Sequence, residues 1–153
     1  MLKDLIKHEY FIKKALEEAH KAADKGEVPV GAVIVIDNKI IARAHNLTQT
    51  LNDVTAHAEI MAITSASNFL NSKYLKECSL YVTLEPCTMC AGAIYWSQIN
   101  QLVFGALDLK RGYSLHGNLL HPKTNVISGI CENESSGLLK DFFKKKKKIK
   151  NLH

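Results

Sequence analysis

Long apolar runs are absent from this sequence. The longest apolar stretch, Val28 to Ile36, contains Pro29 and Gly31, whereas a membrane-spanning helix needs roughly 18 or more apolar residues in succession. The first residues, Met1 to Lys7, mix apolar and charged side chains and offer no hydrophobic core of a secretory signal. We therefore expect a protein that remains in the cytoplasm and does not enter a membrane.

Cysteine is scarce, with four residues only: Cys78, Cys87, Cys90 and Cys131. Inside the cell, thiol reductants keep cysteines reduced, so we expect thiols, metal ligands or core residues rather than disulfides. Only Cys87 and Cys90 stand at a spacing that is typical of a functional site.

Arginine is nearly absent, and the excess positive charge lies at one end of the chain. The formal net charge is +5, but residues 140–153 contain seven lysines and one aspartate, a net charge of +6, so the remainder sums to −1. Such a run is either a solvated tail or a contact for a polyanion. With only Arg43 and Arg111, a phosphate contact would rely on lysine, which attracts phosphate without the fixed geometry of a guanidinium.

The chain has the size and composition of one globular domain, residues 1–153. Of its 153 residues 46% are hydrophobic and 23% are charged, and it shows neither internal repeats nor a linker. Periodicity and turn residues predict helices over 4–25, 56–69, 87–96 and 137–150 and strands over 30–36, 40–45, 79–83, 102–105 and 126–130. This alternation predicts a three-layer α/β/α sandwich with a mixed five-stranded sheet.

Individual residues refine this prediction. Asp37-Asn38 predicts the turn of a hairpin whose first strand is buried on both faces, and Thr55 is expected to cap the second helix. Residues 106–124 are predicted to form a loop. Apolar periodicity predicts the buried residues of the first helix to be Leu5, Ile12, Ala15, Ala19 and Ala22. In a lysine-rich last helix, about 137–153, the expected buried residues are Leu138, Leu139, Phe142 and Phe143.

Two short motifs carry reactive side chains, His57-Ala58-Glu59 and Cys87-x-x-Cys90. Cysteines three residues apart on a helix lie on nearly the same face and can bind one ion, and a helix N-terminus favours the thiolate form that binds metals. A buried or redox pair is the alternative. His57 and Glu59 point about 200° apart on a helix, so they serve one site only if the helix directs its first turn at it.

One imidazole and two thiolates suit tetrahedral zinc with one position left for water. Bound zinc lowers the pKa of its water to about 7, and Glu59, as a carboxylate beside the metal, could carry the proton. A structural zinc site would need a fourth protein ligand. The residues that could supply it, none of which stands in a second ligand motif, are Cys78, Cys131, His45, His116 and His121.

These motifs resemble the known sequence signature of the zinc-dependent cytidine and deoxycytidylate deaminase superfamily. Within it, the chain is similar to the bacterial tRNA-specific adenosine deaminases, and the similarity extends from Val28 to Phe143. The segments that carry it are 28–33, Asn46, 55–60, 83–93, 104–106 and 141–143.

The resemblance implies hydrolytic deamination of adenosine to inosine at the wobble position of a tRNA anticodon, by a homodimer that holds one zinc ion per chain. It implies that His57, Cys87 and Cys90 bind zinc, that Glu59 moves protons and that Asn46 contacts the nucleoside. Further substrate contacts implied by position are Val30, Ala58, Leu84, Asp108, Lys110, Phe142 and Phe143.

Some positions depart from the pattern of these deaminases. Val54 stands where proline is common, Leu107 replaces a frequent arginine, and the match weakens over 111–124. Two other hypotheses stand beside the first. One is a deaminase of a free base or nucleoside, of the guanine or cytosine type. The other is a metal-stabilised RNA-binding module without catalysis, which would need a fourth protein ligand.

Overall fold

A computed structural model describes residues 1–152 of the chain. The helices are α1 (Leu2–Asp24), α2 (Ala58–Leu70), α3 (Thr88–Ser97) and α4 (Glu132–Leu152), with a short 3-10 helix η1 (Tyr113–His116). The strands are β1 (Gly31–Ile36), β2 (Lys39–His45), β3 (Ser79–Leu84), β4 (Gln101–Ala106) and β5 (Asn125–Ile127).

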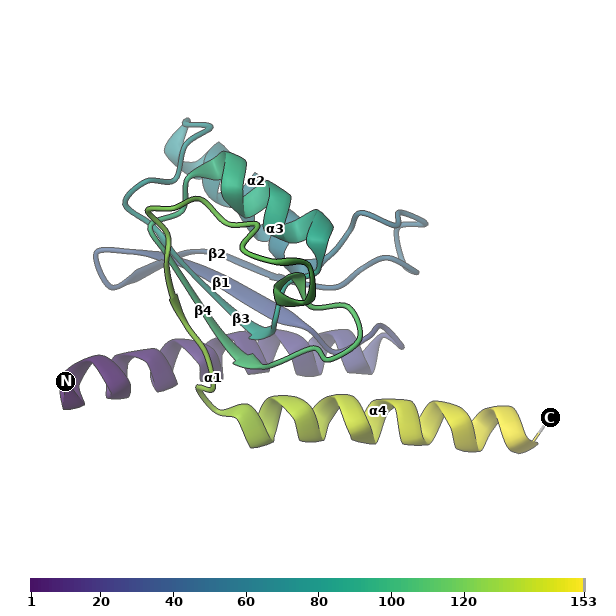
Figure 1. Cartoon of the computed structure of the whole chain (residues 1–153). Helices are drawn as coiled ribbons and strands as arrows, with labels where there is room; N and C mark the ends of the chain where they lie inside the picture. The colour runs from purple at the N-terminus through teal and green to yellow at the C-terminus, as the bar shows by residue number, and fades with distance from the viewer. Residues whose placement is uncertain (153) are drawn as a thin grey trace.

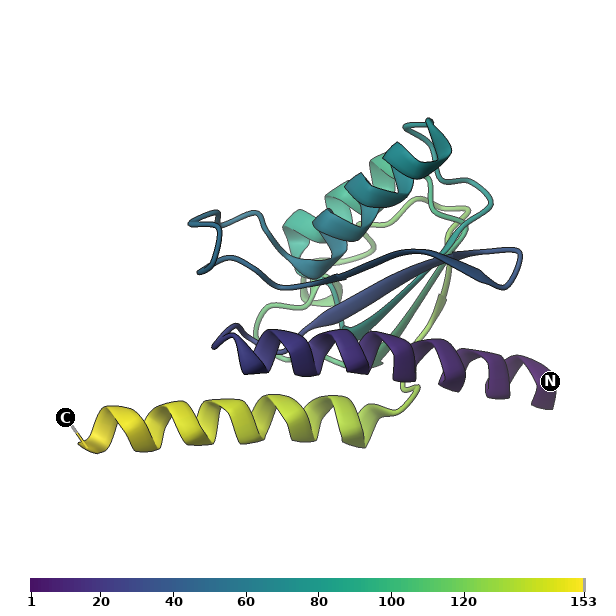
Figure 2. The ribbon, with the colours of Figure 1, turned by 180° about the vertical axis from the view of Figure 1, so that it is seen from behind.

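The strands form one mixed sheet in the order β2-β1-β3-β4-β5. Strand β1 is antiparallel to both β2 and β3, whereas β3, β4 and β5 run parallel. Helices α2 and α3 cover one face, and α1 and α4 cover the other (Figure 1, and from behind in Figure 2). The predicted three-layer α/β/α sandwich with five strands is confirmed.

The sheet separates two hydrophobic clusters because alternate residues of a strand point to opposite faces. In β1, Ala32 and Ile34 belong to the cluster beneath α2 and α3, while Val33 and Val35 belong to the cluster against α1. All four side chains are buried, so the prediction that this strand is covered on both faces is confirmed.

The hairpin between β1 and β2 turns at Asp37 and Asn38, as predicted. Both residues have positive φ, 48° and 63°, which is the backbone conformation that tight two-residue hairpin turns require. This turn lies at the end of β1 remote from Gly31, so Gly31 and its antiparallel partner His45 lie at the opposite end of the hairpin.

Several local predictions are wrong. Helix α2 begins at Ala58, and the Thr55 hydroxyl donates to Asp53 Oδ1 instead of capping the helix. Leu5 is 44% exposed because it lies near the N-terminus of α1, which extends past the sheet (Figure 2). Phe143 is 50% exposed, so it does not belong to the buried side of α4.

The boundaries of the last two elements also differ from the prediction. Strand β5 is shorter, at Asn125–Ile127, and α4 begins at Glu132. The predicted loop between β4 and β5 contains the short helix η1 but is otherwise irregular.

Helix α4 packs on the sheet only through its first half. Leu138 and Leu139 are partly buried against the two hydrophobic clusters, whereas the five lysines of residues 144–148 are all exposed. The second half continues past the sheet, in the same direction as the C-terminal end of α1 (Figures 1 and 2). Among the described residues, no helix combines the length and the apolar character that crossing a membrane requires.

Gly31 is expected to be intolerant of any side chain. A Cβ there would overlap the Ala15 carbonyl oxygen and the Ala19 nitrogen, which belong to the backbone of α1 and cannot rotate away. We predict that Gly31→Ala lowers the free energy of unfolding by about 1–3 kcal/mol or more, measured by denaturant unfolding.

The matched control is Gly92→Ala in α3, where a Cβ would meet no atom within 4 Å. Because alanine is the better helix former, this variant should be neutral or more stable by up to about 1 kcal/mol. Equal effects of the two substitutions would contradict this description of the contact between α1 and β1.

Candidate metal centre and its surroundings

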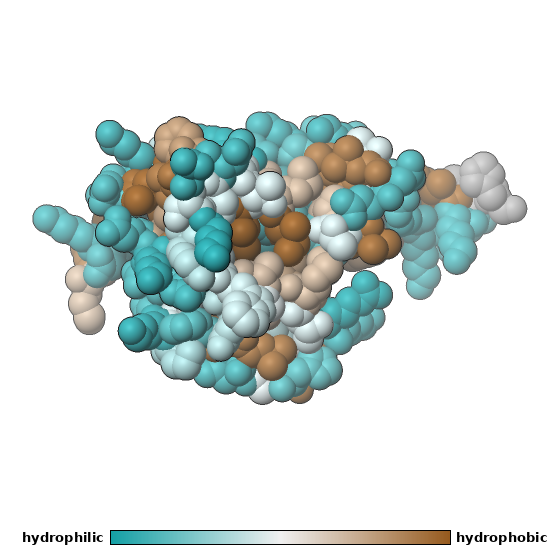
Figure 3. Space-filling view, turned by 90° about the horizontal axis from the view of Figure 1, so that it is seen from above, coloured by the Kyte–Doolittle hydropathy of each residue, from teal (hydrophilic) through white to brown (hydrophobic). Residues whose placement is uncertain are grey.

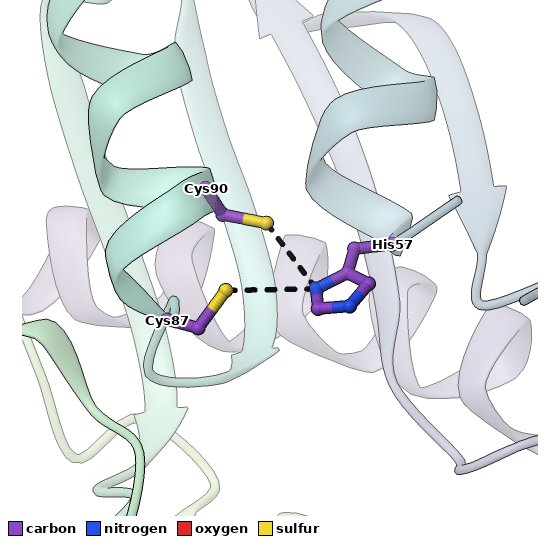
Figure 4. A group of neighbouring side chains, drawn as sticks. All are labelled: His57, Cys87 and Cys90. Atoms are coloured by element: carbon purple, nitrogen blue, oxygen red, sulfur yellow. Dashed lines mark hydrogen bonds between the residues drawn. The ribbon is translucent and has the colours of Figure 1, made fainter. Parts of the chain in front are cut away.

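Helices α2 and α3 begin side by side, and the residues at their starts carry the predicted metal ligands (Figure 4). His57 is the N-cap of α2 and Cys87 the N-cap of α3, while Cys90 lies in the first turn of α3. His57 Nδ1 is 3.6 Å from Cys87 Sγ and 3.5 Å from Cys90 Sγ. Two motifs that are thirty residues apart in the sequence thus meet at one point.

The spacing of the three atoms fits a tetrahedral zinc ion. With Zn–S bonds of about 2.3 Å and Zn–N bonds of about 2.0 Å, tetrahedral angles place sulfur roughly 3.5 Å from nitrogen. Within residues 1–152, these three side chains form the one cluster of at least three potential ligands whose ligating atoms lie within 4.8 Å of one another. The protein therefore offers three ligands and leaves the fourth position to another molecule.

The protonation states of the three ligands are coupled, and one of them, Cys87, is shifted toward the form that binds metal. A hydrogen bond from Cys90 lowers the pKa of the Cys87 thiol to about 4, and the neighbouring His57 acts in the same direction. The same contact with Cys87 raises the pKa of Cys90. The hydrogen bond with Cys87 also raises the pKa of His57. One thiolate is therefore already formed at neutral pH, which is the form of cysteine that binds metal ions.

Glu59 is a buried carboxyl group beside this cluster. Its side chain lies in the first turn of α2, and the residue is 4% exposed. Burial raises its pKa to about 7, and the negative charge of Cys87 acts in the same direction. A carboxyl group with this pKa can both accept and donate a proton near neutral pH.

Asn46 lies directly after β2 and is hydrogen-bonded to two of the other predicted substrate residues, Val30 and Ala58. Its Oδ1 accepts the Ala58 N–H at 2.9 Å, and its own N–H donates to the Val30 carbonyl at 3.1 Å. Asn46 thus accepts a free N–H at the start of α2, which is the capping role that the sequence predicts for Thr55. Val30 is buried and Leu84 half-buried at the end of β3.

The loop that follows β4 is held in place by Glu85. Its two carboxylate oxygens accept the N–H groups of Asp108, at 3.1 Å, and Ser114, at 3.0 Å. Asp108 Oδ1 in turn accepts the N–H groups of Lys110 and Arg111. The Asp108 carboxylate is therefore engaged within the loop, while the side chain of Lys110 is exposed.

Phe142 and Phe143 lie on α4, in the opposite layer from the metal cluster (Figure 1). Their rings pack edge to face with centroids 5.3 Å apart. Phe142 is half-buried and Phe143 exposed. The structure therefore does not bring this pair to the metal cluster, and their contact with a substrate stays a prediction, as do the contacts of the other substrate residues.

Two buried acidic residues near the site were not singled out by the sequence, Glu27 and Glu85. They are 1% and 3% exposed, and each accepts backbone hydrogen bonds from a loop beside the cluster. The sequence signal that could have identified them is an acidic residue beside an apolar, proline-containing segment. Glu27 directly precedes Val28-Pro29-Val30, and Glu85 lies between Leu84 and Pro86.

Comparison with known proteins identifies relatives over most of the chain. Residues 5–106 match the family described as the cytidine and deoxycytidylate deaminase zinc-binding region. A tRNA-specific adenosine deaminase of Bacillus subtilis (strain 168) is 46% identical over 148 residues, which cover 93% of this chain and 92% of the relative.

Two solved structures are similar to this one. One, from a study of A-to-I editing by tRNA:A34 deaminases at the wobble position of transfer RNA, has a TM-score of 0.80 and 46% identity, covering 85% of this chain and 99% of its own. The X-ray structure of guanine deaminase from Bacillus subtilis has a TM-score of 0.63 and 44% identity, covering 65% and 64%.

The raised pKa of Glu59 makes the stability of the metal-free protein depend on pH. The folded-state pKa, about 7, exceeds the ordinary value of 4.5. The stability that the neutral carboxyl contributes is therefore fully present below about pH 4.5 and is lost as the pH rises through 7. Glu59→Gln cannot ionise, so it should stabilise the metal-free protein by up to about 3 kcal/mol at pH 8 and by much less at pH 5.

Thermal unfolding in the presence of a chelator measures this difference. Glu17→Gln, which removes an exposed carboxylate from α1, is the matched control and should show no comparable change between the two pH values. A Glu59→Gln effect of the same size at pH 5 and pH 8 would show that Glu59 is ionised throughout.

Proposed function

This chain belongs to the cytidine and deoxycytidylate deaminase zinc-binding family, and on that premise we propose that it hydrolyses adenosine to inosine at the wobble position of a tRNA anticodon. The observation that carries the proposal is the cluster of three ligands with a buried glutamate beside it. The choice of tRNA is supported by the relative named a tRNA-specific adenosine deaminase, whose similarity covers 93% of the chain. The whole chain would act as one catalytic domain in the cytoplasm.

Each residue of the centre has a separate part in this reaction. His57, Cys87 and Cys90 would hold one zinc ion per chain, and their spacing fits tetrahedral coordination. When bound, zinc supplies Lewis acidity that lowers the pKa of a water molecule to about 7. Glu59 would accept a proton from the attacking water and deliver a proton to the amino group on C6, which leaves as ammonia.

The substrate contacts implied by the family are proposed for the residues around this centre. Asn46 and the Ala58 N–H, which contact each other, would face the purine, and Val30 and Leu84 would line its pocket. The other nucleotides of the anticodon loop would contact Asp108 and Lys110 on the loop after β4, and Phe142 and Phe143 on α4.

We also propose that the protein works as a homodimer. Apolar side chains are exposed on the face formed by α2, α3 and the loops beside them, where Figure 3 shows brown patches among polar residues. Trp96 is 75% exposed and Leu109 80%. Exposed apolar side chains that gather in a patch, rather than single ones, mark a surface that binds another protein chain.

Deamination of free guanine is the second candidate, because a guanine deaminase shares 44% identity with this chain. That structural similarity covers 65% of the chain, however, whereas the similarity to the structure from the study of tRNA:A34 deaminases covers 85%. The exposed lysines of α4 also favour the RNA substrate, since a free base needs no contact with phosphate.

An assay of two substrates separates these functions. We predict that the zinc-loaded protein forms inosine in an anticodon stem-loop with adenosine at the wobble position and releases no ammonia from free guanine. Glu59→Ala should retain about one zinc per chain and lose at least about 100-fold in turnover, because the proton carrier is absent. Ammonia from guanine without inosine in RNA would favour the second candidate, and full turnover by Glu59→Ala would exclude Glu59 from the mechanism.

The lysines of α4 are predicted to bind RNA phosphates. Replacing Lys144 to Lys148 with glutamine should weaken binding of the stem-loop. The slope of the logarithm of the binding constant against the logarithm of the salt concentration should become shallower by about 0.7 for each single-strand phosphate that a lysine no longer neutralises. The control is replacement of Lys39, Lys73 and Lys76, which are exposed on other parts of the molecule. Binding measured across a salt series should be unaffected by the control, and an unchanged slope in the α4 variant would mean that these lysines form only a solvated tail.

A further inference from the structure

Glu27 is a buried acid outside the metal cluster whose carboxylate binds a single loop. It follows α1 and is 1% exposed. One carboxylate oxygen, Oε1, accepts the Gln49 N–H at 3.1 Å and the Thr48 hydroxyl at 3.4 Å. The other, Oε2, accepts the Thr50 N–H at 2.7 Å and the Thr50 hydroxyl at 2.6 Å. Four donors from three consecutive residues therefore converge on one side chain.

These donors keep the carboxylate ionised. Burial opposes ionisation, but the hydrogen bonds from Thr50 and its neighbours lower the pKa of Glu27 overall. A buried carboxylate is costly unless such bonds satisfy it, and bonds to an ionised acceptor are stronger than those between neutral groups. The carboxylate and the segment 48–50 thus depend on each other.

The segment that Glu27 binds belongs to the loop of residues 47–56, which projects from the edge of the sheet between β2 and α2 (Figure 1). Its ends are joined where the Leu47 N–H donates to the Ala56 carbonyl at 3.0 Å. Apolar packing contributes little at its tip, since Leu51 is 53% exposed and Val54 84% exposed. Among the hydrogen bonds of residues 1–152, those to Glu27 are the ones that join segment 48–50 to residues outside the loop.

The two residues that flank this loop are Asn46 and His57. Asn46 accepts the N–H of Ala58 at the start of α2, and His57 contacts both cysteines. Outside the loop, Asn46 is held by its hydrogen bonds with Val30 and Ala58, and His57 by the start of α2, so we expect a shift of the loop to displace both flanking residues. Misplacement of catalytic groups by about 1 Å can reduce a rate about 100-fold.

We propose that Glu27 is a positioning residue for this deaminase: by binding Thr48, Gln49 and Thr50 it fixes the loop that sets Asn46 against the start of α2 and His57 against the two cysteines. The part concerning turnover rests on the proposed function. The part concerning His57 is independent of the substrate, because it concerns how firmly the cluster retains its metal.

The test uses the full-length, zinc-loaded protein and a graded set of variants. Glu27→Gln replaces one acceptor oxygen with a donor, and Thr50→Val removes a single hydroxyl from an exposed residue of the loop. Thr50→Ser keeps the hydroxyl and is the conservative rescue. Glu17→Gln removes an exposed carboxylate from α1 and is the control for charge.

Two rates are measured for each variant, release of zinc to an excess of chelator and turnover of the anticodon stem-loop. We expect Glu27→Gln to release zinc about tenfold faster and to lower kcat about tenfold, with KM changed less because distant lysines hold the RNA. In Thr50→Val, zinc release should be about threefold faster and kcat about threefold lower. Thr50→Ser and Glu17→Gln should match the unmodified protein.

The proposal is overturned if Glu27→Gln lowers Tm while zinc release and kcat stay unchanged, since Glu27 would then support only folding. If Glu27→Gln does not fold, Thr50→Val decides, and unchanged zinc release and kcat in that variant overturn the proposal. Effects of the same size in Thr50→Ser and Thr50→Val would also overturn it. If the unmodified protein does not act on the stem-loop, the proposed function fails, while zinc release still tests Glu27.

Discussion

The site depends on the contact between one imidazole and two thiols at the starts of α2 and α3. Strands β2 and β3 flank β1 and both run antiparallel to it, so they end on the same side of the sheet. The chain enters α2 after β2 and α3 after β3, so the two helices begin near each other. His57 and Cys87 are the N-caps, and their side chains point toward one another, with His57 Nδ1 3.6 Å from Cys87 Sγ. The helix dipoles favour negative charge at this point, which stabilises thiolates and, through them, a bound cation.

Three of the buried glutamates, Glu27, Glu59 and Glu85, lie in or bind the segments that lead into α2 and α3, and their environments give them different properties. Burial without enough donors raises the pKa of Glu59 to about 7, whereas the donors of the loop 47–56 lower the pKa of Glu27. Glu85 accepts two backbone N–H groups from the loop after β4. The same residue type is thus suited to proton transfer in one place and to attachment of a loop in the others, according to the hydrogen bonds that reach it.

Much of this arrangement could be predicted from local patterns in the sequence. The β-branched residues of β1, the Asp37-Asn38 turn and the Cys87-x-x-Cys90 spacing each depend on a few consecutive residues, and the structure has the expected elements there. His57 and the cysteines are far apart in the sequence and no periodicity relates them, so they could be combined only through the ligands that zinc prefers and through the resemblance to a known signature.

Two of the failures arose because the rest of the fold, rather than the local sequence, decided the outcome, and a third arose from a polar helix start. Thr55 is a good capping residue, but Asn46 reaches the start of α2 from the end of β2. Leu5 fits the apolar face of α1, yet that end of the helix extends past the sheet that would cover it. The first turn of α4 is polar, so apolar periodicity did not reveal that it begins at Glu132.

The measurement that tests this account most directly is X-ray absorption at the zinc edge, combined with metal analysis of the purified protein. The account predicts one zinc per chain, bound by two sulfur atoms at about 2.3 Å and by light atoms at about 2.0 Å, one of them from His57 and one from solvent. A third sulfur ligand, or protein without stoichiometric metal, would contradict the open centre from which the catalytic function was inferred.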